Sequence, residues 1–582
     1  MSSSSAFWVQ PKKRTEVWTV GGPPEVRDWA IANVAGWYNS WENNRPKAEV
    51  EVDINPLTYE RIKSFVPAER IHPQVHAQAA KRQARHDLLN RAVAHPQHDR
   101  TDRWPDLFPA QVDGINFLLA AQRAALIYTV GRGKTATAGA AARLVQEGRG
   151  GIAVVVCPKQ PMHDWANELI TRVESDWRVR VVEGSPMARF HIINDAEPGD
   201  LLILNWELLT RHPELFDLDI SVLIGDEIQR LGNRPRTVGA DKKKVGVQTE
   251  AFQKLAAGVE NVYLASGTPT DGNAAAWYSI LRTLDPWRFT SYSRFEGMFV
   301  DTVMGWDNRY KMVVKDNGMN GLKNVDIFTK ILEAYTISRD FEPGELPPTE
   351  REVITIEMAP KHRKLYDQVE QEAFALVDDT GVYIDALNAM GKELRLRQLT
   401  SCTYIFSEEI ADEKVSALAN RVAQVPAEDN VLVFTTFVNR YLLDGDVLAF
   451  LADVVGRVTG REVLTIRGGM KARDIFAISQ RLRHETNLAV VVSTSAGGTG
   501  LNLQGANWQF YLDRDWSLIK NIQAEGRVRR PGQTKTVHII DLAYKDTVDQ
   551  VVREVVARKE PVHNLTFASE VIHRRKMQRE QV

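Results

Sequence analysis

The stretch YTVGRGKTA, which starts at Tyr128, has the residue types and spacing of a phosphate-binding loop. Gly131, Gly133, Lys134 and Thr135 stand in GxGKT order between an apolar run that predicts a strand and an alanine-rich helical segment. N–H groups at the glycines would surround phosphates, Lys134 would reach the β and γ oxygens, and Thr135 would ligate Mg²⁺. Because Tyr128 replaces the first glycine of the usual pattern, a simple glycine turn remains the alternative.

A pair of carboxylates follows another apolar run, in SVLIGDEIQRL. Asp226 would hold Mg²⁺, directly or through water, and Glu227 would polarise the attacking water. Such a pair can also be a helix cap in a favourable dipole, but the lysine loop favours a nucleotide site. A third run ends in LASGTPTDGN, where Ser266 and Thr268 can contact the phosphates or the acidic pair, although GTP is also a common turn sequence.

The elements that must position these residues alternate between apolar runs and helical segments from about residue 107. Runs such as GIAVVVCP, GDLLILN and SVLIGDE are what a parallel sheet buried on both faces requires. A second set begins near residue 430 with DNVLVFTTF, LAVVVSTSAGG and TVHIIDLA. The predicted class is therefore α/β, with two similar lobes.

Composition excludes several other classes of protein. The 582 residues predict two to four domains, and 25% charged and 43% apolar residues are typical of an ordinary globular protein. The two cysteines form no CxxC pair, so neither structural zinc nor a disulfide framework is expected, and a reducing compartment fits best. No signal peptide or membrane span is expected. The net charge of -2 leaves only local basic candidates, KKK at 242–244 and the tail HRRKMQR.

The stretch STSAGGTGLNLQGANWQFYLDRDWSLIKNIQAEGRVRRPGQTKTVHIIDL resembles the Swi/Snf branch of superfamily 2 helicases. In that branch the phosphate loop reads DEMGxGKT, so Tyr128 stands where the family has an acidic residue and does not break the loop. The matching residues are Ala496, Gly497, Gly498, Gly500, Asn502, Leu503, Asp513, Trp516, Gln523, Ala524, Arg527, Arg530, Gly532 and Gln533.

The resemblance implies two tandem RecA-like P-loop lobes that hold ATP and Mg²⁺ in a cleft between them. Arg527 and Arg530, with Gln523 beside them, would act from the second lobe and stabilise the charge of the transition state. Gly500 is a further candidate for nucleotide binding. Gln111, in FPAQVDGINFL, resembles the residue that reads the adenine edge.

A departure from the family pattern lies directly after the acidic pair. The family usually has Asp-Glu-x-His, whereas this chain has Gln229 in the fourth position. We expect this glutamine to act as a hydrogen-bonding relay between the ATP site and the GTP segment.

These observations predict five regions. We expect a mostly helical N-terminal extension of unknown role at 1–100 and lobe one at 101–357, with a helical insertion at 277–345 and the strand REVITIEM at its end. A helical protrusion or linker at 358–411, lobe two at 412–560 and a basic tail at 561–582 follow.

The predicted function is an ATP-dependent DNA translocase that tracks on duplex DNA, mostly through phosphates, to remodel, anneal or branch-migrate. The alternatives are a strand-separating DNA or RNA helicase and a nucleotide-gated clamp with weak hydrolysis. A recruiting protein could bind the N-terminal extension, no membrane contact is expected, and a monomer is the default. The expected location is cytoplasmic, in the nucleoid or host cytoplasm if the source is bacterial or viral.

Overall fold

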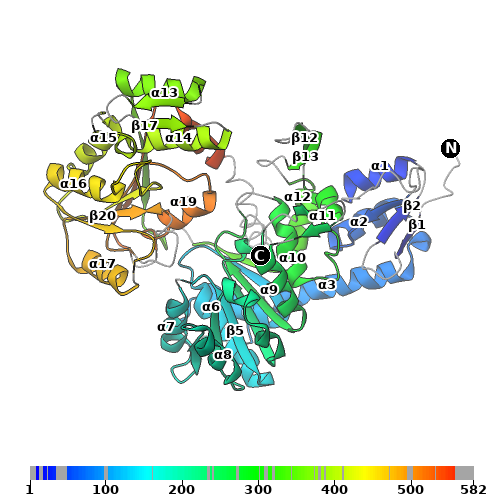
Figure 1. Ribbon diagram of the computed structural model, residues 1–582. Helices are drawn as coiled ribbons and strands as arrows, with labels where there is room; N and C mark the ends of the chain where they lie inside the picture. Colours follow the sequence, from blue (N-terminus) through cyan, green and yellow to red (C-terminus); the bar gives the residue numbers. More distant parts are fainter. Residues whose placement is uncertain are drawn as a thin grey trace. The chain divides into compact units, whose positions relative to one another are not determined.

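The computed structural model divides the chain into two compact units, shown as ribbons in Figure 1. The first comprises residues 1–340 with 559–582, and the second comprises residues 341–558. The structure describes residues 8–11, 18–21, 24–34, 49–97, 103–159, 161–232, 236–238, 242–244, 246–270, 274–300, 302–306, 312–316, 322–341, 344–372, 374–377, 382–385, 389–408, 410, 412–470, 472–494, 503–530 and 533–557. The predicted site residue Gly500 and the basic tail lie outside the described residues.

Seven parallel strands form the central sheet of the first unit: β4 (Arg123–Tyr128), β5 (Ile152–Cys157), β6 (Val179–Val181), β7 (Leu201–Asn205), β8 (Ile220–Asp226), β11 (Asn261–Ser266) and β14 (Thr336–Arg339). Their order across the sheet is β14-β4-β11-β8-β5-β7-β6. Every residue of β5, β8 and β11 is buried, which is the burial expected of a sheet covered on both faces.

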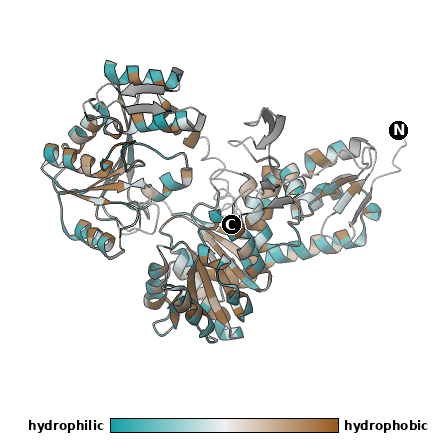
Figure 2. Ribbon diagram, in the orientation of Figure 1, coloured by the Kyte–Doolittle hydropathy of each residue, from teal (hydrophilic) through white to brown (hydrophobic). Residues whose placement is uncertain are grey.

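Helices connect these strands and cover the sheet: α5 (Pro109–Ala121), α6 (Lys134–Arg149), α7 (Met162–Arg172), α8 (Pro186–Asn194) and α9 (Val247–Ala257). Side chains alternate along each strand between two apolar layers, so that Ala125 and Ile127 join one layer and Ala124 and Leu126 join the other. Figure 2 shows the hydrophobic strands inside this unit and hydrophilic residues on the surrounding helices.

Six parallel strands form the sheet of the second unit: β15 (Thr349–Ile356), β18 (Val431–Thr435), β19 (Glu462–Ile466), β20 (Leu488–Ser493), β21 (Trp508–Tyr511) and β22 (Val537–Tyr544). Their order is β15-β22-β21-β18-β20-β19. The helices around it are α15 (Glu413–Val422), α16 (Val447–Thr459), α17 (Ala472–His484) and α19 (Leu518–Glu525). Two parallel sheets with connecting helices confirm the predicted α/β class with two RecA-like lobes.

The expected end of lobe one at residue 357 is wrong, because REVITIEM belongs to the second sheet. Strand β15 pairs in parallel with β22 over its whole length, from Thr349 opposite Val537 to Ile356 opposite Tyr544. Ile354 and Ile356 pack against the apolar core of the second unit. The chain therefore leaves the first unit after β14, about residue 340, and not after β15.

Helices and short hairpins project from both sheets. The insertion predicted at 277–345 contains α10 (Trp277–Leu284), α11 (Tyr292–Phe299), α12 (Val325–Leu332) and the hairpin β12 (Thr302–Trp306) and β13 (Met312–Asp316). The protrusion predicted at 358–411 contains α13 (Pro360–Glu372), α14 (Ala389–Ser401) and the hairpin β16 (Phe374–Val377) and β17 (Val382–Asp385). A hairpin of β9 (Arg236–Val238) and β10 (Lys242–Lys244) carries the KKK run.

The N-terminal extension contains helices, as predicted, and also a sheet that was not predicted. The helices are α1 (Pro24–Asn33), α2 (Pro56–Phe65) and α3 (Pro73–Ala94). The strands β1 (Trp8–Pro11), β2 (Trp18–Gly21) and β3 (Glu49–Val52) form an antiparallel sheet. None of the described helices is long and apolar enough to cross a membrane.

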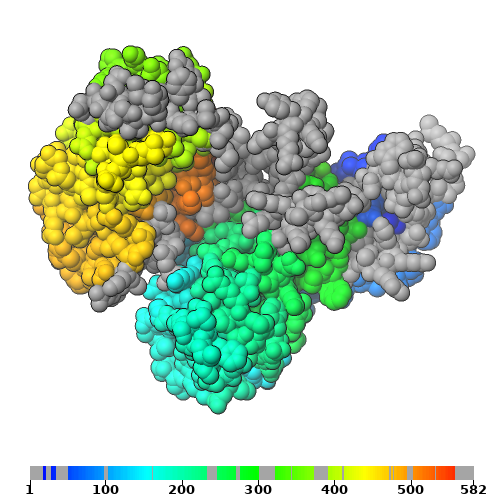
Figure 3. Space-filling model, viewed as in Figure 1, coloured from blue at the N-terminus to red at the C-terminus, as the bar shows by residue number. Residues whose placement is uncertain are grey.

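Buried ion pairs join the N-terminal extension to the insertion of the first unit. Asp53 makes two hydrogen bonds with the guanidinium of Arg288, whose side chain is 4% exposed, and Glu51 pairs with Arg294 at 2.5 Å. Figure 3 shows the N-terminal segment in blue against the green insertion. Because an unpaired buried charge is costly, these pairs make the extension an integral part of the first unit.

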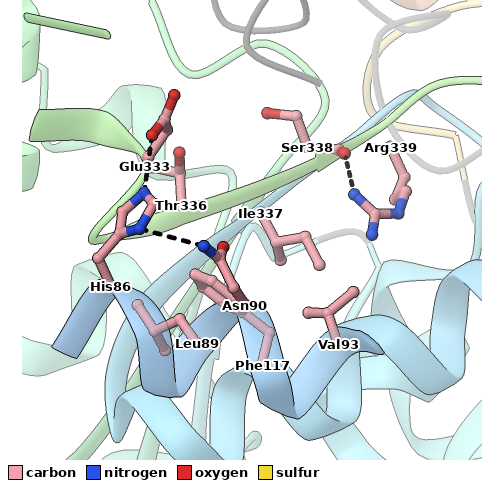
Figure 4. A pocket seen from close by; sticks show the side chains of 10 residues that line it. All are labelled: His86, Leu89, Asn90, Val93, Phe117, Glu333, Thr336, Ile337, Ser338 and Arg339. Carbon is pink, nitrogen blue, oxygen red and sulfur yellow. Dashed lines mark hydrogen bonds and ion pairs between the residues drawn. The ribbon is translucent and has the colours of Figure 1, made fainter. Parts of the chain in front are cut away.

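A cavity of about 60 Å³ lies where α3 crosses β14 (Figure 4). His86 and Asn90 of α3 form a hydrogen-bonded group with Glu333, and Ile337 of β14 and Phe117 of α5 supply apolar walls. The cavity contains none of the residues predicted to bind nucleotide.

Candidate active site

The predicted site residues of lobe one meet at the carboxyl edge of the first sheet. Strand β11 lies between β4 and β8, and it pairs in parallel with both. The lysine loop follows β4, Asp226 ends β8, and Ser266 ends β11. The carboxyl edge of a parallel sheet is where ligands bind in this class of fold, so the three segments form one candidate site.

The loop between β4 and α6 has the backbone of a phosphate cradle. Gly131 and Gly133 have φ values of 90° and 81°, a left-handed conformation that glycine adopts without strain. Lys134 is the first residue of α6, and its Nζ donates a hydrogen bond to the carbonyl of Tyr128 at 3.0 Å. The amino group is thus held against the loop beside the N-terminus of a helix, where anions are favoured.

Tyr128, which stands where the family has an acidic residue, points its side chain away from the phosphate loop and into the core. Its ring is fully buried, and its hydroxyl donates a hydrogen bond to the carbonyl of Ala110 in α5. A Cβ atom on Gly114 would lie 2.3 Å from that hydroxyl, so α5 accepts the ring only because position 114 is glycine. Tyr128 therefore belongs to the packing between α5 and β4.

Gln111 is buried, and both ends of its side-chain amide have backbone partners. The oxygen accepts a hydrogen bond from the N–H of Phe108 at 2.8 Å, and the nitrogen donates to the carbonyl of Gly133 at 3.1 Å. The amide therefore connects α5 to the phosphate loop through the carbonyl of Gly133. The contact with adenine predicted for Gln111 stays a prediction.

The two carboxylates after β8 have different surroundings. Trp165 donates its indole N–H to Oδ2 of Asp226 at 2.9 Å, and the N–H of Glu227 donates to Oδ1 at 2.9 Å. Burial and the neighbouring charge of Glu227 raise the pKa of Asp226 to about 7, while Lys134 and these hydrogen bonds act in the opposite direction. Glu227 has a left-handed backbone (φ 55°), the kind of strained geometry that proteins retain at functional sites.

The relay expected for Gln229 is confirmed. Its amide nitrogen donates to Oε2 of Glu227 at 2.5 Å, and its amide oxygen accepts from the hydroxyl of Ser266 at 2.9 Å. Ser266 in turn accepts from the N–H of Thr268 at 2.9 Å. The relay Glu227–Gln229–Ser266–Thr268 thus connects the carboxylate predicted to polarise water with the GTP segment.

Two further residues of the site, Trp165 and Glu168, come from α7 and were not predicted from the sequence. Trp165 donates a hydrogen bond to Asp226, and the carboxyl of Glu168 lies close enough to Thr135, Ala136 and Lys134 for these groups to oppose the rise in its pKa. Burial raises the pKa of Glu168. The three-residue spacing of a Trp and a Glu on one helix face is the only signal in the sequence, and it does not by itself identify a site.

Thr135 and Asp226 fit the magnesium ion that the resemblance implies. Hydroxyl and carboxylate oxygens are the hard ligands that Mg²⁺ prefers, and this ion commonly takes one or two protein ligands together with substrate phosphates. No group of three or more His, Cys, Asp or Glu side chains converges among the described residues. A phosphate-bound metal held by Thr135 and Asp226 is therefore the arrangement that these residues support.

In the second unit, the predicted arginines follow α19. Gln523 and Arg527 are 8% and 4% exposed, and Arg530 donates from Nε to the carbonyl of Gly526 at 2.7 Å. Gln533 holds the same region by donating to the carbonyls of Gln504 and Ala506. Their predicted catalytic roles stay predictions.

The carboxyl edge of the second sheet carries hydroxyl side chains. Thr435 donates to Oδ2 of Asp513 at 2.9 Å, and Ser401 donates to the same oxygen at 2.6 Å. The hydroxyls of Thr436 and Thr494 are buried without a hydrogen-bond partner among the described residues. Because β18 and β20 are neighbours, these two hydroxyls end adjacent strands.

Comparison with known proteins adds independent information. The family model "SNF2-related domain" matches residues 92–404, and "Helicase conserved C-terminal domain" matches residues 413–532. The chain is 23% identical over 489 residues to chromodomain-helicase-DNA-binding protein 8 of Rattus norvegicus, a match that covers 76% of this chain and 18% of that protein. It is 24% identical over 471 residues to SWI/SNF-related matrix-associated actin-dependent regulator of chromatin subfamily A member 1 of Mus musculus, covering 76% and 42%.

A solved structure is also similar, the Sulfolobus solfataricus SWI2/SNF2 ATPase core in complex with dsDNA. It is 18% identical, with a TM-score of 0.37, and the match covers 81% of this chain and 96% of that one. The chain spans less than half the length of each of the two curated relatives named above, 18% of one and 42% of the other.

Proposed function

The chain belongs to the SNF2-related family, in the Swi/Snf branch of superfamily 2, and from this premise we propose that it is an ATP-dependent translocase that tracks along double-stranded DNA. Family membership confirms the resemblance predicted from the sequence, and it supports the predicted class of enzyme, a helicase-type or translocase-type ATPase.

The observation that carries the proposal is the convergence of Lys134, Asp226 and Glu227 at the carboxyl edge of the first sheet. Lys134 is close enough to Asp226 for its charge to oppose the rise in the pKa of that carboxyl. Glu227 is held by Gln229, and its oriented carboxylate would position a water molecule for attack on a γ-phosphate. A bound magnesium ion would neutralise phosphate charge at this position.

Arg527 and Arg530 are proposed to complete the catalytic set from the second lobe. An arginine that reaches the γ-phosphate stabilises charge in the transition state and accelerates hydrolysis by about 10³-fold or more. Because the P-loop and the arginines lie in different units of the chain, hydrolysis would require the lobes to close. Such a requirement converts chemistry into movement along DNA.

DNA contact is proposed to run through phosphates, with little sequence preference and strong salt dependence. The hydroxyls of Thr436 and Thr494, which have no hydrogen-bond partner in the described part of the chain, support phosphate contact on the second lobe, since buried polar groups without partners are rare in folded proteins. Remodelling, annealing and branch migration are the outcomes that tracking on a duplex could produce.

Two other functions use the same fold. A strand-separating DNA or RNA helicase would need a wedge between strands, and a nucleotide-gated clamp would hydrolyse ATP only weakly. The relay from Glu227 to Thr268 favours a working ATPase over a clamp, because a vestigial site has no need to orient its carboxylate.

Steady-state ATPase assays with duplex DNA, single-stranded DNA and RNA test the proposal. We expect duplex DNA to stimulate hydrolysis most, Lys134→Ala to abolish the activity, and Lys254→Ala, an exposed lysine on α9, to leave it unchanged. Stronger stimulation by RNA or single strands would favour the conventional helicase. If folded protein hydrolysed no ATP with any of these nucleic acids, the nucleotide-gated clamp would be the remaining function.

A further inference from the structure

Helix α7 lies against the magnesium site predicted at the carboxyl edge of the first sheet. Trp165 and Glu168 are three residues apart, so both side chains leave the same face of this helix. One contacts Asp226 and the other contacts Thr135, which are the two residues that fit Mg²⁺. A single helix therefore contacts both predicted metal ligands.

Close packing of α7 against α6 makes the contact with Thr135 possible. Gly139 lies on α6, one turn after Thr135, and a Cβ atom at this glycine would lie 2.1 Å from Cδ2 of Leu169. Leu169 directly follows Glu168 and is fully buried. The absence of a side chain at Gly139 thus allows α7 to approach the first turns of α6, where Thr135 is located.

The neighbours of Asp226 and Thr135 leave the oxygens of both side chains able to bind a cation. A hydroxyl has one hydrogen to donate and two lone pairs, and the carboxyl of Glu168 beside Thr135 favours the hydroxyl orientation that keeps those lone pairs for a cation. Asp226 accepts one hydrogen bond on each oxygen, from Trp165 and from the N–H of Glu227, and each oxygen keeps further acceptor capacity.

We propose that α7 orients the magnesium site: Trp165 and Glu168 are positioning residues that hold Asp226 and Thr135 ready for the metal and thereby set the affinity of the protein for Mg²⁺-nucleotide. The inference rests on the proposed ATP site and extends it to residues outside the phosphate loop and the acidic pair. Residues that orient metal ligands typically change metal affinity by about 10-fold to 100-fold when they are replaced.

The test measures binding of a fluorescent ADP analogue as Mg²⁺ is titrated, in the full chain and without any need for turnover. For Trp165→Phe we expect unchanged binding in EDTA and a rise of about 10-fold or more in the Mg²⁺ concentration that gives half-maximal tightening. Trp177→Phe is the matched control, because Trp177 is also buried and donates its indole N–H, but to Gln146 and Gly199 away from the site.

A second pair of variants separates positioning from stability. Glu168→Ala removes the carboxyl that lies beside Thr135 and should weaken the Mg²⁺ response, whereas Glu168→Gln keeps an acceptor oxygen at this position and should restore the response. Thermal midpoints recorded for all four variants show that each is folded at the titration temperature.

Equal Mg²⁺ responses in Trp165→Phe and Trp177→Phe would overturn the inference. Wild-type protein that binds no nucleotide would overturn both the inference and the proposed function. If the wild-type protein bound Mg²⁺-nucleotide but duplex DNA did not stimulate its ATP hydrolysis, only the proposed translocase function would be overturned. The proposed role of α7 would stand.

Discussion

The hydroxyl of Ser266 donates a hydrogen bond to the side-chain oxygen of Gln229 across 2.9 Å, and both residues are part of the relay Glu227–Gln229–Ser266–Thr268. Ser266 ends β11, the strand that separates the lysine loop from the acidic pair. The relay therefore connects the GTP segment through hydrogen bonds to the carboxylate that is predicted to orient water.

Breaking this relay should slow hydrolysis and leave nucleotide binding intact. For Ser266→Ala we expect a fall in kcat, because Gln229 loses the partner that fixes its amide and Glu227 becomes mobile. The typical contribution of a positioned acid–base group, about 10²-fold to 10⁴-fold, is an upper limit for the fall in kcat. Ser221→Ala is the control, since Ser221 is equally buried in β8 but bonds the carbonyl of Ile152. An unchanged kcat in Ser266→Ala would contradict the relay.

Replacing Gln111 should damage the phosphate loop whether or not this residue contacts adenine. In Gln111→Ala the N–H of Phe108 loses its side-chain acceptor, and the carbonyl of Gly133 keeps its hydrogen bonds from Thr137 but loses the one that joins it to α5. We expect weaker binding of ATP and of inorganic triphosphate, measured by calorimetry. Gln146→Ala breaks similar hydrogen bonds, from α6 to the carbonyls of Gly151 and Asp200, and should reduce stability without weakening nucleotide binding. If Gln111→Ala weakened ATP binding but not triphosphate binding, the adenine contact would be its main role.

The arginines after α19 should be needed for hydrolysis and dispensable for binding. We expect Arg527→Lys to lower kcat by about 10³-fold, because lysine cannot reproduce the planar fork of guanidinium. Binding of a nonhydrolysable ATP analogue should be unchanged. Arg529→Lys is the neighbouring control, since Arg529 is exposed. Similar losses of kcat in both variants would contradict a specific role for Arg527.

Glu333 should contribute a pH-dependent term to the stability of the first unit. Burial alone would raise its pKa, but hydrogen bonds from His86 and Lys330 outweigh burial and lower the pKa to about 2. A carboxyl whose pKa falls on folding stabilises the protein above its unfolded pKa, about 4.3 for glutamate, and loses that effect as pH falls towards 2.

Calorimetric midpoints of wild type and Glu333→Gln test this contribution. The free energy of unfolding should be higher in the wild type than in Glu333→Gln at pH 7, by at most about 3 kcal/mol. This difference in free energy should become smaller below pH 4.3. Glu69 is exposed, so Glu69→Gln is the control and should have the same free energy of unfolding as the wild type. A difference that stayed constant down to pH 3 would exclude the ion pair as its cause.

Much of the first sheet was predictable because its strands are continuous apolar runs that end in polar residues. β5 and β8 are buried at every position, and the motif residues occur where such strands stop. The relay through Gln229 was predictable for a similar reason, since its position two residues after Glu227 is local in sequence.

The features that were not predicted depend on contacts distant in sequence. Strand β15 is an edge strand with mostly exposed side chains, so nothing in REVITIEM indicates which sheet it joins. Trp165 meets Asp226 across 61 residues only because α7 packs closely on α6. The N-terminal strands are four residues long, too short for a periodic pattern to distinguish them from loops.

Displacement of a third strand from duplex DNA is the most direct test of the central claim. A translocase that tracks on a duplex removes a bound triplex-forming oligonucleotide in its path without separating the duplex. We predict ATP-dependent release by the wild type and none by Lys134→Ala, with a forked duplex of the same sequence left intact. Unwinding of the fork without release of the third strand would contradict tracking on duplex DNA and would identify a strand-separating helicase.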